Sequence, residues 1–369
     1  MPSAPSASAL PVAPAALRAA PKVLLHDHLD GGLRPTTLVQ LAAEYGVALP
    51  TTAPDELAAH IQRGAASGSL MQYLEPFSYT VAVLQTQEAL VQVAAECVVD
   101  LAADGVVYAE IRFAPELSTA GGLDLADVVD AVLEGLQRGM SQAQSNGHRI
   151  QARALLCAMR QESRSREIAE LTRMYHQAGT GVVGFDIAGP ETGFPPGDHA
   201  ASFALLREAG VPFTVHAGEA AGLDSIVGAL DVGAHRLGHG VHLAADLTVS
   251  DHTVSLGPVA RRVVEESAAL ELCPKSNVDT CAVRSLAEHP FVALERVGVP
   301  VTVNTDNRLM SGTSMTEEFA RLAGQFGYDL AGLERLTKTA MDAAFVPGPL
   351  RRSITAEQIV PGYAAAQGL

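Results

Sequence analysis

The chain has 369 residues, a formal net charge of −16 and a hydrophobic content of 48%, which is sufficient for one large packed core. A surface that binds nucleic acid needs excess positive charge to neutralise phosphates, so nucleic acid is a poor expected partner. No apolar run approaches the roughly 18–20 residues that span a bilayer, and the N-terminus lacks the features of a secretory signal. Four cysteines without a CxxC pair predict reduced thiols in a cytoplasmic protein, and the charge suits a small neutral or weakly charged ligand.

Apolar runs rich in Val, Ile, Leu and Phe alternate with longer helix-like stretches from residue 22 onward. Residues 1–20 are rich in Ala, Pro and Ser and are expected to be an unstructured extension, followed by a single domain over residues 21–369. Short continuous apolar runs are typical of strands that are buried on both faces, as in parallel sheets. The predicted strands are Lys22–His28, Val106–Phe113, Ile150–Met159, Gly181–Ala188, Val211–His216, His235–His239, Ala268–Cys273 and Val299–Thr305.

Eight strands joined by helices predict a (β/α)8 barrel of the TIM type rather than an open doubly wound sheet. The segment after the first predicted strand, Asp30–Pro35, lacks the G-x-G-x-x-G fingerprint of a dinucleotide-binding fold. The stretch from Leu33 to Ala103 exceeds one crossover helix, so we expect extra helices beside the barrel mouth that could form a lid. The predicted amphipathic helices include Gln87–Ala103, Leu125–Asn146, Ser163–Ala178 and His199–Ala209.

Polar residues end several of these strands, where a barrel of this type places its chemistry. His26 and His28 lie two residues apart on one strand, so their side chains point to the same side. His216 ends the fifth strand and His239 lies between glycines at the end of the sixth. Asp306 follows the eighth apolar run, where a buried carboxylate needs a partner such as a cation.

A barrel would bring these strand ends together around one centre. Each of these residues alone is more simply explained as a structural side chain, but their convergence at strand ends favours a metal site. Imidazole and carboxylate ligands with an open position for water suit zinc.

The ordered motifs resemble those of the adenosine deaminase family of the amidohydrolase barrels over about residues 22 to 345. The motifs are Lys22-Val-Leu-Leu-His26-Asp-His28-Leu-Asp30-Gly31, His216-Ala-Gly-Glu219, Arg236-Leu-Gly-His239-Gly240 and Asn304-Thr-Asp306.

The resemblance implies a zinc-dependent deamination of a purine nucleoside at C6, with one zinc ion per chain. Glu219 corresponds to the acid that protonates purine N1, and His239 to the residue that orients and helps to deprotonate the attacking water. Bound zinc would lower the pKa of that water toward about 7. The implied catalytic residues are Glu219, His239 and Asp306, and the implied zinc ligands are His26, His28, His216 and Asp306.

The resemblance also implies a substrate pocket. Asp30 corresponds to the residue that hydrogen-bonds the ribose, Gly189 to the backbone contact with N3, and Leu70–Thr80, with Leu74 and Phe77, to an apolar lid. The family usually has a second Asp after the metal-binding one, whereas this chain has Asn307, so the contact with N7 and the identity of the substrate are put in doubt. The implied substrate-binding residues are His28, Asp30, Gly189, Asn307 and Phe77.

Three alternatives remain at this point. The same reaction could act on adenine or on aminodeoxyfutalosine in place of adenosine and 2′-deoxyadenosine. A hydrolase with two metals bridged by a lysine is disfavoured, because Lys22, Lys275 and Lys338 are the chain's lysines and none ends a middle strand. A non-catalytic purine-binding or interaction protein would not need Glu219 and the whole ligand set. The oligomeric state is not predicted.

Overall fold

The computed structural model describes residues 12–66, 68, 70–250 and 253–369. Helix α1 (Pro14–Ala19) begins at a proline, whose fixed φ suits the first helical turn, and it buries Ala16 and Leu17. The expected unstructured extension of residues 1–20 therefore does not include α1, while residues 1–11 lie outside the described residues.

The strands form a closed (β/α)8 barrel, as predicted. Two four-stranded parallel sheets, in the orders β1-β2-β3-β4 and β10-β9-β6-β5, meet edge to edge. A bridge between Asp27 and Asp306 joins the first and last strands, and a bridge between Phe185 and Phe213 joins the other two edges. The barrel strands are β1 (Lys22–His28), β2 (Val106–Phe113), β3 (Gln151–Met159), β4 (Val182–Ala188), β5 (Thr214–Ala217), β6 (Arg236–His239), β9 (Ala269–Leu272) and β10 (Val301–Val303).

Two strands begin two or three residues later than the sequence predicts. The fifth begins at Thr214 instead of Val211, and the last begins at Val301 instead of Val299. A proline lies inside each predicted start, Pro212 in one and Pro300 in the other. Proline has no N–H to donate to the sheet, so regular pairing begins only after it.

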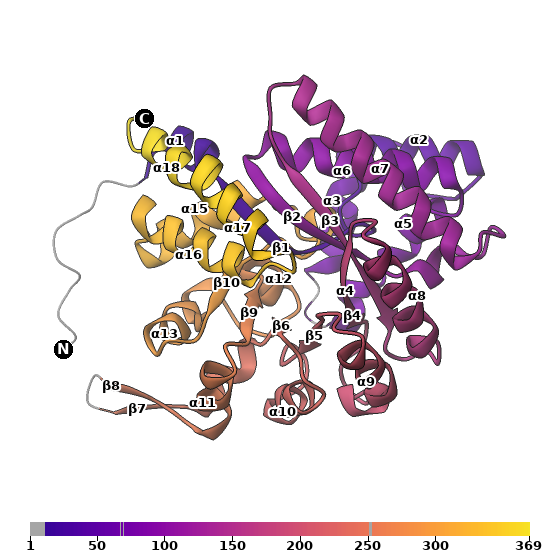
Figure 1. The fold of residues 1–369 in the computed structure, drawn as a ribbon. Helices are drawn as coiled ribbons and strands as arrows, with labels where there is room; N and C mark the ends of the chain where they lie inside the picture. The colour runs from indigo at the N-terminus through magenta and orange to yellow at the C-terminus, as the bar shows by residue number, and fades with distance from the viewer. Residues whose placement is uncertain (1–11, 67, 69, 251–252) are drawn as a thin grey trace.

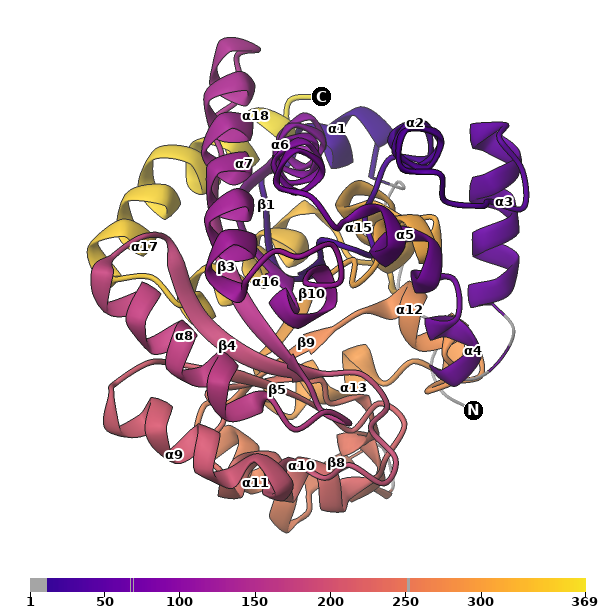
Figure 2. The ribbon, with the colours of Figure 1, turned by 90° about the vertical axis from the view of Figure 1, so that its right-hand side faces the viewer.

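Helices surround the barrel and alternate with its strands (Figure 1). The expected extra helices after β1 are present and lie together at one side of the barrel in Figure 2: α2 (Pro35–Tyr45), α3 (Pro54–Ala65), α4 (Leu70–Leu74) and α5 (Phe77–Val83). The further helices are α6 (Gln87–Ala103), α7 (Leu125–Ser145), α8 (Ser165–Ala178), α9 (Ala200–Glu208), α10 (Leu223–Asp231), α11 (Pro258–Glu265), α12 (Pro274–Asp279), α13 (Phe291–Arg296), α14 (Arg308–Ser311), α15 (Met315–Phe326), α16 (Leu330–Ala343), α17 (Gly348–Ile354) and α18 (Val360–Ala366).

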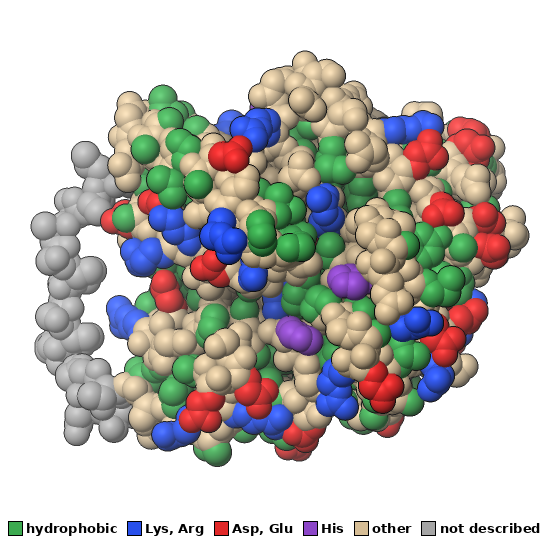
Figure 3. Space-filling view, in the orientation of Figure 1, with side chains coloured by type: hydrophobic (Ala, Val, Ile, Leu, Met, Phe, Trp, Pro, Cys, Tyr) green, Lys and Arg blue, Asp and Glu red, His purple; other side chains and the backbone are tan. Residues whose placement is uncertain are grey.

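A pair of strands outside the barrel was also not predicted. Strands β7 (Leu247–Ser250) and β8 (Thr253–Leu256) pair antiparallel between β6 and α11. On the face shown in Figure 3, Lys and Arg side chains are interspersed with Asp and Glu side chains. No helix among the described residues has the length and apolar character to cross a membrane.

Candidate metal centre and active site

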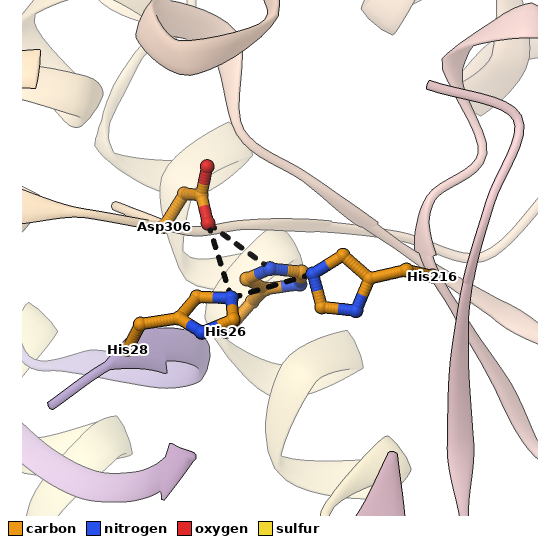
Figure 4. Close-up of side chains that lie close together, drawn as sticks. All are labelled: His26, His28, His216 and Asp306. Carbon is orange, nitrogen blue, oxygen red and sulfur yellow. Dashed lines mark hydrogen bonds and ion pairs between the residues drawn. The ribbon is translucent and has the colours of Figure 1, made fainter. Parts of the chain in front are cut away.

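The four predicted metal ligands converge at the end of the barrel strands. His26 and His28 come from β1, His216 comes from β5, and Asp306 follows β10. One ligand atom from each lies within 4.8 Å of all the others, and Figure 4 shows the three rings and the carboxylate directed toward one another. Asp306 Oδ1 is 3.2 Å from His26 Nε2 and 3.4 Å from His28 Nε2. The Nε2 atoms of His28 and His216 are 3.3 Å apart.

Two carboxylates on the outer side of the cluster fix the orientation of the imidazole rings. His26 Nδ1 lies 2.8 Å from Glu271 Oε2, and His216 Nδ1 lies 2.8 Å from Asp186 Oδ2. When Nδ1–H donates to a carboxylate, the Nε2 atom of the neutral ring presents its lone pair to the opposite side. The centre is therefore lined by electron-pair donors from three rings and one carboxylate, a set that fits a zinc ion.

The charge of the surroundings also favours a cation here. Burial lowers the pKa of both His28 and His216, which keeps these rings neutral and able to bind a metal. Burial and Arg112 lower the pKa of His26 too, but its hydrogen bonds to Asp306 and Glu271 outweigh them and raise it. The carboxylates of Asp306 and Glu271 therefore stabilise positive charge at the position of His26.

Arg112 connects the two outer carboxylates. Its guanidinium lies 2.6 Å from Asp186 Oδ2 and 2.8 Å from Glu271 Oε2, and all three side chains are fully buried. Arg236 adds a contact of 2.6 Å to the other oxygen of Glu271. Sequence reasoning missed these residues, although a charged residue inside an apolar strand, as in Ala269–Leu272, was a usable signal.

The backbone of Asp306 is hydrogen-bonded to β1 through both its N–H and its carbonyl group. Its N–H donates to the carbonyl of His26 at 2.9 Å, and its own carbonyl accepts from the N–H of His28 at 2.8 Å. Ser276 Oγ donates to Asp306 Oδ2 at 2.6 Å, which leaves Oδ1 to face the histidines. Asp306 and His239 adopt φ values of 60° and 61°, a left-handed conformation that such residues hold only when the surroundings impose it.

The two remaining predicted catalytic residues lie beside the ligand cluster. His239 Nε2 is 3.5 Å from Glu219 Oε2. The backbone N–H of Cys273 donates to Asn277 Oδ1 at 3.3 Å, which directs Asn277 Nδ2 to His239 Nδ1 at 3.1 Å. Because Nδ1 accepts this hydrogen bond, the neutral His239 ring carries its proton on Nε2, facing Glu219.

Glu219 is a carboxyl group in an environment that disfavours its ionised form. The side chain is buried, and burial raises the pKa of Glu219 well above its ordinary value. The negative charges of Asp306 and Glu191 raise it further. Glu219 is therefore held protonated at a pH where an exposed glutamate is ionised.

A cavity of about 440 Å³ brings the predicted substrate-binding residues together. His28, Asp30, Gly189 and Asn307 line it, as do Glu219, His239 and Asp306. Its other wall comes from α4 and α5, the predicted lid, through Leu70, Tyr73, Leu74, Phe77, Ser78 and Val81. Among the described residues, the lining is mostly apolar and contains no lysine or arginine, so the cavity suits a flat, uncharged ring system.

Asn307 is oriented by the close approach of the chain at Gly31. A Cβ atom placed on Gly31 would lie 1.9 Å from Asn307 Oδ1, so only glycine fits there. Tyr73 of the lid contacts the same region, where its hydroxyl lies 3.0 Å from Ser311 Oγ.

Comparisons with known proteins agree with this geometry. The family model described as "Adenosine deaminase" matches residues 21–360. The chain is 53% identical to "Adenosine deaminase" of Mycobacterium sp. (strain KMS) over 352 residues, which cover 95% of this chain and 97% of that protein. It is 52% identical to "Adenosine deaminase 1" of Streptomyces coelicolor, with coverage of 98% and 91%.

Solved structures share the fold at lower identity. An amidohydrolase from Burkholderia ambifaria with bound zinc superposes with a TM-score of 0.82 at 22% identity, covering 98% of this chain and 96% of that one. An adenine deaminase from Arthrobacter aurescens gives 0.79 at 24% identity, with coverage of 95% and 100%. Together with the family match over most of the sequence, these findings settle the classification: the chain belongs to the adenosine deaminase family of hydrolases.

Proposed function

We propose that this chain converts adenosine and 2′-deoxyadenosine to the 6-oxo nucleosides and ammonia, with one zinc ion held by His26, His28, His216 and Asp306. The observation that carries the proposal is the placement of a buried carboxyl group with a raised pKa, Glu219, in the same cavity as the ligand cluster. Zinc, when bound, supplies Lewis acidity that makes water acidic near neutral pH. The side chains of the cavity do the rest of the chemistry.

Glu219 activates the purine ring. C6 of an aminopurine resists attack by water until the ring can accept electrons, and a proton on N1 provides that capacity. The raised pKa of Glu219 keeps a proton available above the pH at which an exposed glutamate ionises, which suits a general acid in this position. The same carboxyl group loses this role once it is ionised.

His239 orients the attacking water, and Asp306 accepts its proton. The hydrogen bond from Asn277 leaves His239 with an Nε2–H that can hold the water oxygen in place. Asp306 is an ionised carboxylate, because hydrogen bonds and the surrounding histidines outweigh burial and keep its pKa well below the ordinary value. It can accept the proton and return it to the departing ammonia.

The remaining cavity residues distinguish the parts of the substrate. Burial raises the pKa of Asp30 to about 6, which leaves it ionised at neutral pH and able to accept from a ribose hydroxyl. The backbone N–H of Gly189 suits purine N3, and the amide of Asn307 suits N7.

The free state of the described cysteines fits action in the cytoplasm.

A substrate panel tests the proposal. We expect kcat/KM to be highest for adenosine and 2′-deoxyadenosine, and far lower for adenine and aminodeoxyfutalosine, as followed by the loss of the aminopurine absorbance. Asp30→Ala should reduce kcat/KM for adenosine much more than for adenine, because the lost hydrogen bond is to the ribose. A preference for adenine or aminodeoxyfutalosine would contradict the proposed substrate.

A further inference from the structure

The carboxylate of Glu191, whose charge contributes to the raised pKa of Glu219, accepts several hydrogen bonds of its own. It is buried, with a relative exposure of 4%. Its Oε1 accepts from the backbone N–H of Gly218 at 2.5 Å and from Ser225 Oγ at 2.5 Å. Its Oε2 accepts from the backbone N–H groups of Glu219 at 3.0 Å, Ala220 at 2.6 Å and Ala221 at 2.8 Å.

These donors belong to the turn that carries the proposed acid. Residues Gly218–Ala221 directly follow β5 (Thr214–Ala217), and consecutive N–H groups of the turn point at one carboxylate. Gly218 has a φ of 75°, and a Cβ atom there would lie 2.6 Å from the side chain of Ile226. The turn is therefore fixed from one side by packing and from the other by Glu191.

Glu191 itself lies on the loop that carries the proposed contact with N3. It is two residues beyond Gly189, which lines the cavity and has a φ of 101°. N1 and N3 belong to the same six-membered ring of a purine. Their two proposed donors, the carboxyl of Glu219 and the N–H of Gly189, come from different loops, and the side chain of Glu191 is a direct link between those loops.

We propose that Glu191 is a positioning residue that sets Glu219 in register with Gly189, so that N1 and N3 of one purine ring meet their donors at the same time. This inference rests on the proposed roles of Glu219 and Gly189. It assigns to Glu191 no contact with the substrate.

A carboxylate is the group that this position requires. An ionised carboxylate only accepts hydrogen bonds, whereas the amide of glutamine would direct two N–H donors at the N–H groups of the turn. Burial raises the pKa of Glu191, but the hydrogen bonds from Ser225 and the backbone outweigh burial and lower it, so the group stays ionised. Glu191→Gln should therefore displace the turn while leaving the metal ligands intact.

The test compares Glu191→Gln with three other variants of the zinc-loaded enzyme. Ser225→Ala removes one hydrogen bond from the same carboxylate and leaves the turn's N–H contacts in place. Glu191→Asp keeps the charge but is one methylene shorter, so it separates charge from position. Glu219→Gln removes the acid itself and tests the proposed function directly. For each variant, kcat, KM, zinc content and the urea midpoint are measured.

Two ligands separate positioning of the acid from general damage to the pocket. 1-Deazaadenosine has no N1, so its binding does not use the proton of Glu219. Purine ribonucleoside has no 6-amino group, so water can add across N1 and C6, with hydrogen to N1 and hydroxyl to C6, but no ammonia can leave. Formation of this hydrate removes the aromatic absorbance of the ring and depends on a correctly placed acid.

We expect Glu191→Gln and Glu191→Asp to lower kcat about 10²-fold, the loss typical of a misplaced catalytic group, with KM changed less than about threefold. Hydrate formation should fall by the same factor, while zinc content and the affinity for 1-deazaadenosine stay at the wild-type level. Ser225→Ala should stay within about threefold of wild type.

The inference is overturned if Glu191→Gln keeps wild-type kcat and hydrate formation while Glu219→Gln loses both. It is also overturned if the affinity for 1-deazaadenosine and the urea midpoint fall together with kcat, because that pattern indicates a purely structural residue. If Glu219→Gln retains wild-type kcat, the proposed acid is wrong and the inference fails with it.

Discussion

Arg308 forms an ion pair with the buried carboxylate of Asp27, the residue that lies between the two histidines at the end of β1. Its Nε lies 3.1 Å from Asp27 Oδ1, and Thr305 Oγ1 donates to the same oxygen at 2.7 Å. Arg308 follows Asp306 closely in the chain. The ion pair therefore connects the strand that carries His26 and His28 to the segment that carries Asp306, and it lies outside the ligand cluster.

Removing one partner of this pair should be costly. Arg308→Met leaves the carboxylate of Asp27 buried without its cation, and we expect the free energy of unfolding to fall by about 3–5 kcal/mol. Urea denaturation at a fixed zinc concentration measures this loss. The double variant Asp27→Asn with Arg308→Met should recover part of it, since no unpaired charge remains. A loss below about 1 kcal/mol for the single variant would contradict the expectation.

The metal site gives a second prediction. The purified protein should contain about one zinc ion per chain, and His216→Ala should lose both the metal and the activity, because a ligand of the set is gone. Elemental analysis and an absorbance assay measure the two quantities. His148→Ala is a matched control, since this exposed histidine lies outside the cluster. Full activity after exhaustive chelation would show that no metal is needed.

The raised pKa of Glu219 predicts how kcat/KM depends on pH. Its folded-state pKa is raised above the ordinary value, so the active protonated form persists above the pH at which an exposed glutamate ionises and is lost as the pH rises through the raised pKa. We expect the alkaline limb of the kcat/KM profile to follow this ionisation. Glu219→Gln should keep zinc and bind substrate but lower kcat at least 10²-fold, because an amide cannot donate a proton to N1. An unchanged kcat in this variant would place the proton donor elsewhere.

Asn307 should contact N7 as a donor at any pH. Asn307→Asp should make kcat/KM newly dependent on pH, with a fall as the introduced carboxyl ionises, because N7 accepts hydrogen bonds and a carboxylate cannot donate one. Asn307→Leu should cost about 1–3 kcal/mol of transition-state stabilisation.

The control for Asn307 is a substrate without the acceptor. 7-Deazaadenosine should be poor for the wild type and only slightly worse for Asn307→Leu. Equal losses on adenosine and 7-deazaadenosine would show that Asn307 does not contact N7, and the residue would then act only on the loop that packs against Gly31.

The predictable part of this fold follows from local pattern. Buried parallel strands give continuous apolar runs, so the barrel strands could be located from the sequence, and the ligand residues could be grouped because they end those strands. Partners across the barrel give no such pattern. The sequence marks Arg112, Asp186 and Glu271 as charges inside apolar strands. Only the closed barrel brings the two carboxylates to the outer nitrogens of the histidines, with the arginine between them.

Other differences have equally physical causes. The Ala- and Pro-rich composition of helix α1 predicts an unstructured extension, yet α1 packs against α15 and α18 and buries Leu17. The antiparallel pair β7 and β8 is too short to show a clear alternation. The role of Glu191 could not be predicted from the sequence because its partners are mainly backbone N–H groups, which every residue type except proline has.

The contacts between β1 and the segment that follows β10 close the barrel and also bring the metal ligands together. Metal binding would therefore depend on the completion of folding. Asn304 Oδ1 accepts the backbone N–H of Leu25 at 2.9 Å, across 279 positions of sequence separation. Contacts of such long range form only after a large loop has closed, so they are slow to form and come late. During synthesis, the first histidines would leave the ribosome long before the aspartate that completes their set. Uptake of the metal ion would then mark the moment at which the barrel has closed.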